Sequence, residues 1–353
     1  MNGQRISGIL AALAAALLFG ASTPLAKLLL TRIDPWLLAA LLYLGSGVGL
    51  WLLRRLGRAE AVRLERGDWG WLAAAIAAGG VAAPLLLMFA LSAMPATTAA
   101  LLLNAEAVLT VLLAWFLFRE PFDRRIAAGM LTIVAGALLL SWPQRLQLAT
   151  LWPTLALLAA ALAWAIDNNL TRKIALADAS FIAMSKGLIA GSTNLLLALQ
   201  LRVDWPAPGV VATAALLGLL CYGVSLTLFV VALRQLGAAR TSAYFGLAPF
   251  WGALLAIALL GEPLTPQLLV AALLMAVGVA LHLTERHQHL HHHAPMSHRH
   301  RHHHALDGDP HHDHSHAEPV PPGTGHSHFH HHPALSHDHP HFPDAHHGHR
   351  HPD

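Results

Sequence analysis

Long apolar runs, separated by short charged or Pro/Gly-rich breaks, fill the first 284 residues of the sequence. The runs approach the ~20 residues that a helix needs to cross a bilayer. Inside a bilayer the backbone must satisfy its own hydrogen bonds, so helices are favoured over an open sheet. The pattern predicts ten spanning helices, near 8–30, 35–53, 70–92, 95–118, 125–142, 150–171, 179–201, 209–233, 239–260 and 265–284.

The composition supports a lipid environment. Hydrophobic residues make up 55% of the chain and charged residues only 12%, whereas charged residues are about 25% of a typical globular protein. The segment from Arg5 to Ala26 imitates a secretory signal, but its apolar part is long for one, and a retained first span is expected. Cys221 is the only cysteine, so no intramolecular disulfide and no Cys-based metal site are expected.

Basic residues are distributed unevenly over the predicted loops. Short cytoplasmic loops of membrane proteins retain Lys and Arg, so the bias gives an orientation. The outer loops hold only Lys27, Arg32, Arg145 and Arg202. The inner segments hold Arg5, Arg54, Arg55, Arg58, Arg63, Arg66, Arg119, Arg124, Arg125, Arg172, Lys173, Arg234 and Arg240. We therefore expect both termini in the cytoplasm.

The chain repeats itself. "FALSAMPATTAALL" from Phe89 aligns with "VALRQLGAARTSAY" from Val231, and "LFREPF" from Leu117 with "LLGEPL" from Leu259, at an offset of 142 residues. At an offset of 145, "FGASTPLAK" from Phe19 aligns with "WAIDNNLTR" from Trp164. Five spans in each half, an odd number, invert the second half. Inverted repeats are typical of secondary transporters, with the site between the halves.

These motifs resemble the drug/metabolite transporter superfamily, specifically its EamA-type members. The resemblance covers about residues 5–284 and depends on "REPF", "GEPL", "LFGASTPLAK" and "LLNAEAVLTVLLAWFLFRE". It implies an all-α membrane protein of two inverted five-helix repeats that exports or exchanges small metabolites without a bound cofactor. The expected parts are a first repeat at 1–142, a linker at 143–149, a second repeat at 150–284, and a disordered His-rich cytoplasmic tail at 285–353.

Glu106 is the strongest candidate for transport chemistry. A charge at the centre of a spanning helix costs roughly 2.5–3.5 kcal/mol even on a mild insertion scale, so a retained one needs a reason. Glu106 lies near the middle of the fourth span with Asn104 nearby, and Thr110 is four residues on, on the same helix face. The residue could bind a substrate amine or a proton, or it could only pack the bundle through a hydrogen bond.

A second polar group interrupts the sixth span. Asp167, Asn168 and Asn169 align with Ser22, Thr23 and Pro24 of the first span, and paired interruptions predict discontinuous helices at a binding site. A polar inner helix end is the alternative. Lys186 lies at similar depth on the seventh span, so an ion pair with Asp167 is expected, as a gate or a structural bridge. Tyr244 on the ninth span could line a passage for an organic substrate.

All 27 histidines lie at or beyond His282, in a segment with too few apolar residues for a core. Neutral imidazole binds Zn, Ni, Co and Cu, and a flexible chain can gather several imidazoles around one ion. The candidate metal ligands are His291, His292, His293, His302, His303, His304, His326, His328, His330, His331 and His332. Incidental polyhistidine is the alternative.

Three functions remain open from the sequence. The first is a secondary transporter of small metabolites, with export as the expected direction, whose tail binds divalent transition metals. The second is a transporter of Ni, Co, Zn or a metal chelate, and the third a membrane-anchored metal store or sensor. No nucleophile–base set or phosphate-binding loop appears, so an enzyme is not expected. The expected location is a bacterial-type inner membrane, and the expected partners are a small solute, lipid and metal ions, with no nucleic acid.

Overall fold

The chain forms two compact units in the computed structural model, Met1–Glu285 and Arg286–Asp353. Where it is described, the first unit is helical and the second holds four short strands. The structure describes residues 2–57, 62, 64, 67–118, 124–141, 148–174, 178–236, 244–283, 288–293, 296–303, 325–332 and 335–340. Most of the expected linker (143–147) and the candidate ligand His304 lie outside these residues.

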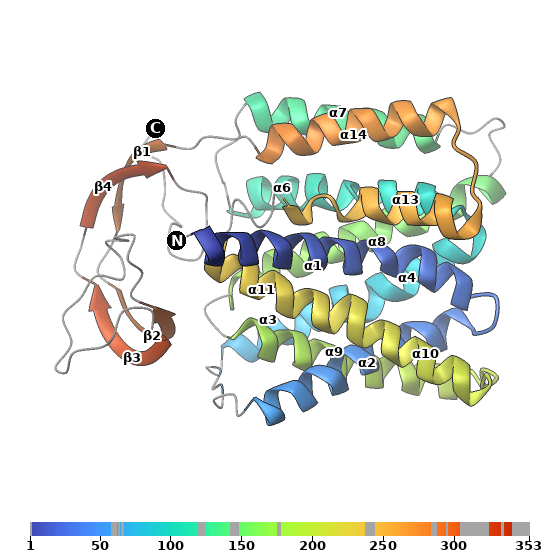
Figure 1. Cartoon of the computed structure of the whole chain (residues 1–353), viewed down its shortest axis with the longest axis horizontal. Coiled ribbons are helices and arrows are strands. Elements are labelled where there is room, and N and C mark those ends of the chain that lie inside the picture. The colour runs from blue at the N-terminus through green and yellow to red at the C-terminus, as the bar shows by residue number, and fades with distance from the viewer. Residues whose placement is uncertain are drawn as a thin grey trace. The chain divides into compact units, whose positions relative to one another are not determined.

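The helices of the first unit fall where the apolar runs predict them, as Figure 1 shows. The first half holds α1 (Asn2–Leu29), α2 (Pro35–Leu56), α3 (Asp68–Ala75), the π-helix η1 (Ile76–Ala82), α4 (Ala83–Ala93), α5 (Ala96–Leu102), α6 (Ala105–Phe118) and α7 (Arg124–Ser141). The second half holds α8 (Leu148–Arg172), α9 (Ala179–Gln200), α10 (Pro208–Gly218), the π-helix η2 (Leu219–Val224), α11 (Ser225–Leu236), α13 (Ala248–Leu260) and α14 (Pro266–Leu283).

Seven helical stretches in the described residues are long and apolar enough to cross a membrane. Three further apolar helices, Ala127–Leu140, Ala248–Leu260 and Pro266–Leu281, are shorter and fall in the expected fifth, ninth and tenth spans. The helical membrane-protein class is thus confirmed. The number of ten spans stays a prediction.

Polar side chains and special residues set the ends of several helices. Asp34 starts α2, because its carboxylate accepts the backbone N–H of Trp36 at 2.8 Å. Gly261 ends α13 with φ of 65°, a left-handed conformation that glycine adopts without strain. Glu262, in the turn that follows, accepts the backbone N–H groups of Ala96 and Thr97 at 2.7 and 2.8 Å and so caps the start of α5.

Glycines let several helix pairs approach closely. A Cβ added at Gly187 of α9 would lie 2.6 Å from the Cα of Gly47 in α2, and one added at Gly278 of α14 would lie 2.6 Å from the carbonyl oxygen of Gly129 in α7. Such distances are shorter than van der Waals contact, so only glycine fits. Glycines thus permit the close packing of α2 against α9 and of α7 against α14, and Figure 1 shows α7 beside α14 at one edge of the bundle.

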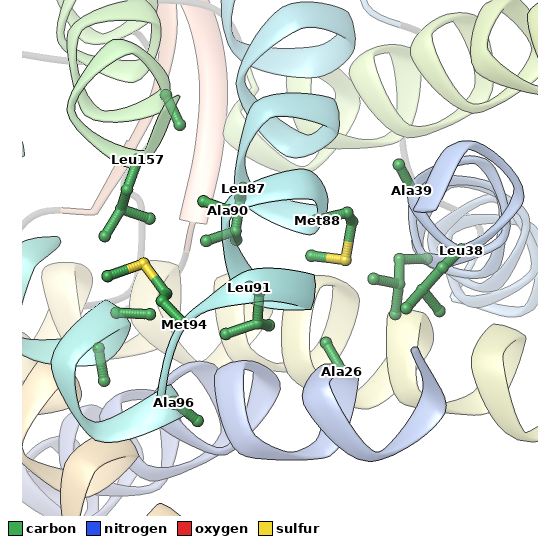
Figure 2. Close-up of a cluster of buried hydrophobic side chains, with 14 of the residues drawn as sticks. Ala26, Leu38, Ala39, Leu87, Met88, Ala90, Leu91, Met94, Ala96 and Leu157 are labelled. Carbon is green, nitrogen blue, oxygen red and sulfur yellow. The ribbon is translucent and has the colours of Figure 1, made fainter. Parts of the chain in front are cut away.

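The largest buried cluster is centred on α4. Leu87, Met88 and Leu91 of this helix are almost fully buried, and Leu38 of α2 and Leu157 of α8 pack into the same cluster. Figure 2 shows these side chains meeting between the helices. The cluster packs α4 against α2 and α8. Helix α8 carries most of the candidate polar residues.

The interruptions of the helices are paired, but not where the sequence analysis predicts them. Helix α1 runs through Pro24, and α8 runs through Asp167 to Asn169, so the prediction of discontinuous first and sixth spans is wrong. A proline ring costs only one internal backbone hydrogen bond, and the three polar residues of α8 find partners without unwinding. The breaks lie instead at Leu103–Asn104 and at Gly246–Leu247, 143 residues apart, and the π-helices η1 and η2 form a second pair.

The second unit also differs from the prediction. Instead of a tail without regular structure, its described residues form β1 (Gln288–His293), β2 (Met296–His303), β3 (Gly325–His332) and β4 (Leu335–Pro340). Strand β1 pairs with β4 and β2 with β3, both antiparallel. Backbone hydrogen bonds alone can form such two-stranded pairs without an apolar core, although they are marginally stable in water.

Candidate functional site

The site begins at the break between α5 and α6. Asn104 closes this break, because its Nδ2 donates to the carbonyl oxygen of Leu101 at 2.9 Å. The break places Glu106 in the first turn of α6. The positive end of the helix dipole lies at such a start and favours a carboxylate. Asn104 itself is buried toward Met275 of α14, away from the carboxylate of Glu106.

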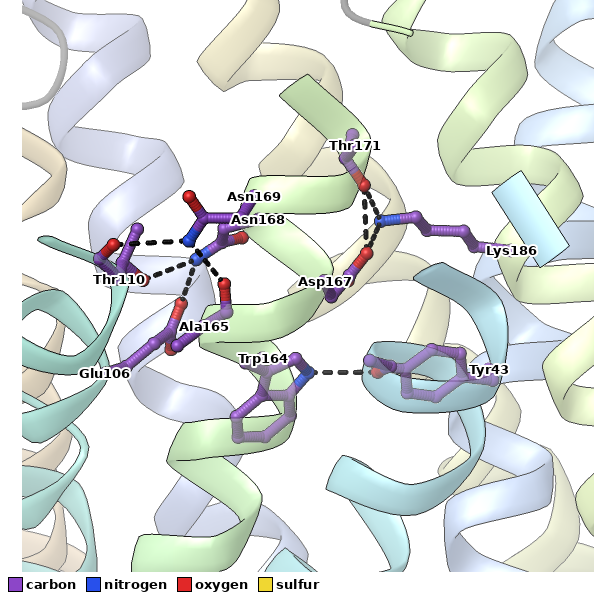
Figure 3. Close-up of polar contacts among 11 residues, drawn as sticks. Tyr43, Glu106, Thr110, Trp164, Ala165, Asp167, Asn168, Asn169, Thr171 and Lys186 are labelled. Atoms are coloured by element: carbon purple, nitrogen blue, oxygen red, sulfur yellow. Dashed lines mark hydrogen bonds and ion pairs between the residues drawn. The ribbon is translucent and has the colours of Figure 1, made fainter. Parts of the chain in front are cut away.

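Glu106 meets Asn168 of α8. The Asn168 Nδ2 donates to the Glu106 carboxylate at 2.8 Å and lies 3.4 Å from the hydroxyl of Thr110. The predicted common face of Glu106 and Thr110 is therefore confirmed. Asn168 is exposed and Glu106 is half-buried, although both belong to apolar helices. Figure 3 shows this group on one side of α8.

Asn169 anchors α8 to α6. Its Nδ2 donates to the carbonyl oxygen of Thr110 at 3.2 Å and to that of Ala165, one turn earlier in α8, at 2.9 Å. The side chain is 5% exposed, so these bonds satisfy a buried amide. Asn169 therefore positions the two helices, while Asn168 remains accessible.

The opposite side of α8 carries the expected ion pair. Lys186 Nζ lies 2.5 Å from the Asp167 carboxylate and 2.8 Å from the hydroxyl of Thr171, which itself donates to Asp167 at 2.9 Å. Asp167 is buried, and the Lys186 side chain is 17% exposed. The pair neutralises both charges inside the apolar bundle. Figure 3 shows it separated from Glu106 by the body of α8.

A backbone carbonyl close to Asp167 also accepts hydrogen bonds, and the sequence did not predict it. The oxygen of Gly79, in η1, accepts from the hydroxyl of Tyr43 at 2.8 Å and from the indole N–H of Trp164 at 3.0 Å. A side chain at position 79 would overlap the Asp167 carboxylate. The Gly79–Gly80 pair inside an apolar run was the available signal, since π-helices occur frequently at functional sites.

The two carboxylates differ in their charge balance. Asp167 is paired with Lys186, whereas Glu106 forms no ion pair with a basic residue in the part of the chain that the structure describes. Its hydrogen-bond partner Asn168 is neutral. Glu106 is therefore the position where a cation or a proton would restore neutrality.

The remaining candidates lie elsewhere. Thr23 is buried on α1, and Tyr244 packs against Ala11 of α1 and Ala232 of α11. Neither belongs to the group around Glu106. Among the residues whose side chains are described, no group of three or more His, Cys, Asp or Glu is placed to hold a metal ion. The candidate tail ligands other than His304 lie on β1, β2 and β3.

Several known proteins are similar to this chain in sequence or in fold. The chain is 28% identical over 295 residues to an uncharacterised transporter of Methanothermobacter thermautotrophicus, covering 78% of this chain and 86% of that protein. It is 31% identical over 262 residues to an uncharacterised protein of Pseudomonas aeruginosa, covering 72% and 86%. A solved structure 21% identical in sequence matches with a TM-score of 0.61, covering 78% of this chain and 95% of that one.

A shorter match concerns a probable 4-amino-4-deoxy-L-arabinose-phosphoundecaprenol flippase subunit of Pseudomonas paraeruginosa. It is 45% identical over 80 residues, which cover 23% of this chain and 66% of that protein. The model of the EamA-like transporter family matches twice, at residues 6–142 and 151–284. The duplicated match, the apolar helices and the relatives agree, and this integral membrane protein belongs to the EamA-like transporter family, whose members move small substrates across lipid.

Proposed function

We propose that the chain is a secondary transporter that exports small metabolites through a passage beside Glu106 and Asn168. The supporting observation is the accessibility of these two side chains. A carboxylate and an amide in apolar spans are costly in hydrocarbon, so accessible ones belong next to water or substrate. Asp167 and Lys186, already paired with each other, would hold α8 and α9 together at the edge of this passage.

The proposed architecture is ten spans in two inverted five-helix repeats, at 1–142 and 150–284. Helix pairing supports the inversion: α1 packs against α11 and α13, and its repeat equivalent α8 packs against α4 and α6. The self-related pairs, α2 with α9 and α7 with α14, fit the same two-fold relation. The paired breaks and π-helices add to it. Alternating access would then come from motion of one half against the other.

The proposed orientation places both termini in the cytoplasm, with the chain in a bacterial-type inner membrane. The bias of Lys and Arg toward the predicted inner loops supports it. No bound cofactor is needed for this function, because a proton or solute gradient can drive exchange.

The charge balance favours a substrate that carries a primary amine. A cationic amine could replace a proton on Glu106, and Asn168 could orient it. Exchange of the amine against protons would then be the natural coupling. The name of the flippase relative includes an amino sugar, which is a molecule with a primary amine. Free amino acids and polyamines carry the same group.

The test is resistance to toxic concentrations of amine-bearing metabolites. Cells expressing the protein should tolerate at least one of a panel of amino acids, diamines and amino sugars better than cells with an empty vector. Glu106→Gln removes the charge with little change in volume, so it should abolish the protection. The matched control is Asp204→Asn, which neutralises an exposed carboxylate next to the predicted outer loop.

Membrane levels of each variant are measured in parallel. Protection that survives Glu106→Gln at equal protein level would contradict the assigned site. A complete lack of protection or flux for every panel compound would contradict the amine class. Loss in both variants would show that the effect is not specific to Glu106.

A further inference from the structure

The β2–β3 pair sorts histidines by face. Antiparallel register places His298 opposite His330, His300 opposite His328, and His302 opposite His326. Residues two apart in a strand share a face, so the backbone register places these six positions on one face of the pair, whose strands are labelled in Figure 1. The other face holds two histidines, His303 and His331, with Arg299, Arg301, Phe329, Ser297, Ser327 and Gly325.

The β1–β4 pair is built in the same way. His289 lies opposite His339 and His291 opposite His337, and His293 shares their face. The opposite face has a single histidine, His292, beside residues such as Leu290 and Asp338. Consecutive histidines in a run therefore lie on opposite faces of the pair. Histidines with HxH spacing lie on the same face.

Such a face has the spacing of a metal site. Directly opposed residues on one face of an antiparallel pair have Cβ atoms about 4.5–5.5 Å apart, and neighbours along the strand are about 6.8 Å apart. Four histidines at the corners of such a rectangle can converge on one ion, with metal–nitrogen bonds of about 2.0–2.1 Å for Zn²⁺. We propose that His298, His300, His328 and His330, on the shared face of β2 and β3, form a Zn²⁺ site.

The chemistry of the ligand set suits Zn²⁺. Four imidazole nitrogens without a thiolate suit Zn²⁺, Cu²⁺ and Ni²⁺, and a tetrahedral set is the geometry of structural zinc sites. The site would also stabilise the strands. A two-stranded pair is marginal in water, and an ion that binds only the paired form contributes its binding free energy to folding.

The site is independent of transport, so its test requires no substrate. The full-length protein in lipid nanodiscs is titrated with Zn²⁺ against a competing chromogenic chelator. Two double variants remove the same number of histidines: His300→Ala/His328→Ala from the shared face, and His303→Ala/His331→Ala from the other face. The first double variant should lower the Zn²⁺ affinity of the tightest site by about tenfold or more. Loss of a single residue that only hydrogen-bonds to a metal ligand already lowers metal affinity by about 10–100-fold. The second should leave that site within about twofold of the original protein.

Hydrogen exchange supplies a second readout. Zn²⁺ should slow amide exchange across residues 296–303 and 325–332 in the unaltered protein and in the His303/His331 variant, but not in the His300/His328 variant. Equal weakening in both variants would show that binding follows the number of histidines and not the face, which would overturn the proposal. Absence of any Zn²⁺-dependent protection of these strands would overturn it as well.

Discussion

Helix α6 packs against α8, and its repeat equivalent α13 packs against α1, yet the two contacts have opposite chemistry. The first carries Glu106 and Asn168, with an accessible hydrogen bond of 2.8 Å between them. At an offset of 142 residues Glu106 corresponds to Ala248, and at an offset of 145 Asn168 corresponds to Thr23. Ala248 and Thr23 are both buried.

The second contact brings two backbones together. A Cβ added at Gly252 of α13 would lie 2.9 Å from the carbonyl oxygen of Gly20 in α1, and one added at Gly20 would overlap the Ala248 carbonyl. Contact this close leaves no room for polar side chains. The comparison teaches that the duplicated fold supplies two equivalent positions, and that the close α1–α13 contact excludes the polar side chains that the α6–α8 contact holds.

The largest effect is expected at the buried ion pair between Asp167 and Lys186, on the opposite side of α8 from the polar contact. Lys186→Met leaves Asp167 as an uncompensated buried charge, and breaking such a pair costs about 3–5 kcal/mol. The double variant Asp167→Asn/Lys186→Met removes both charges and should recover most of that stability. Cys221 is the only cysteine and is buried, so a thiol-reactive fluorophore reports thermal unfolding in detergent. A single variant as stable as the double would show that the pair is not what holds α8 to α9.

The close contact between α1 and α13 should be destabilised by added volume. Gly20→Ala adds one methyl group between α1 and α13, and overpacking of this kind costs about 1–3 kcal/mol. Gly70→Ala in α3 is the matched control, because a Cβ there meets nothing within 4 Å and alanine favours a helix over glycine by about 0.5–1 kcal/mol. The same fluorescence assay should show a lower Tm for the first variant and an equal or higher Tm for the second. Equal Tm values would mean that α1 and α13 can separate without cost.

The apolar pattern of the sequence predicted much of this comparison. Runs of Ala and Leu located the helices, and the offsets of 142 and 145 residues located the equivalent positions, because both depend on local composition and order along the chain. The ion pair between Asp167 and Lys186 was also predictable, since two opposite charges in apolar spans at similar depth are strongly driven to meet.

The position of the helix breaks was not predictable in the same way. Polar triplets suggested breaks in α1 and α8, but the triplet of α8 finds its partners on α6 and α9, which only the tertiary structure reveals. The carbonyl of Gly79 was missed for a similar reason. A backbone acceptor leaves no residue type in the sequence, and its donors Tyr43 and Trp164 come from distant helices. Strand pairing in the tail likewise depends on register between segments far apart in sequence.

The smallest effect extends the comparison to α2 and α9, which begin with the N-cap residues Asp34 and Asp178. Burial alone would raise the pKa of Asp178, but hydrogen bonds from Ser180 and the Phe181 N–H, together with Arg54 at 2.9 Å, outweigh it and hold this pKa below 3.8. A carboxyl with a lowered folded-state pKa stabilises the protein above its unfolded pKa, and this stability is lost as pH falls through the folded value.

Asparagine keeps the cap but removes the charge. Asp178→Asn should therefore lower the free energy of unfolding at pH 7 by a few tenths to about 1 kcal/mol, the range of a partly exposed ion pair. Asp34→Asn, whose described side-chain contact is the Trp36 N–H, is the control and should cost less. Thermal unfolding followed by tryptophan fluorescence from pH 7 to pH 3 should show the Asp178 difference shrinking below pH 3.8. A difference that stays constant from pH 7 to pH 3 would assign the loss to packing at the α9 start and not to the charge that distinguishes it from α2.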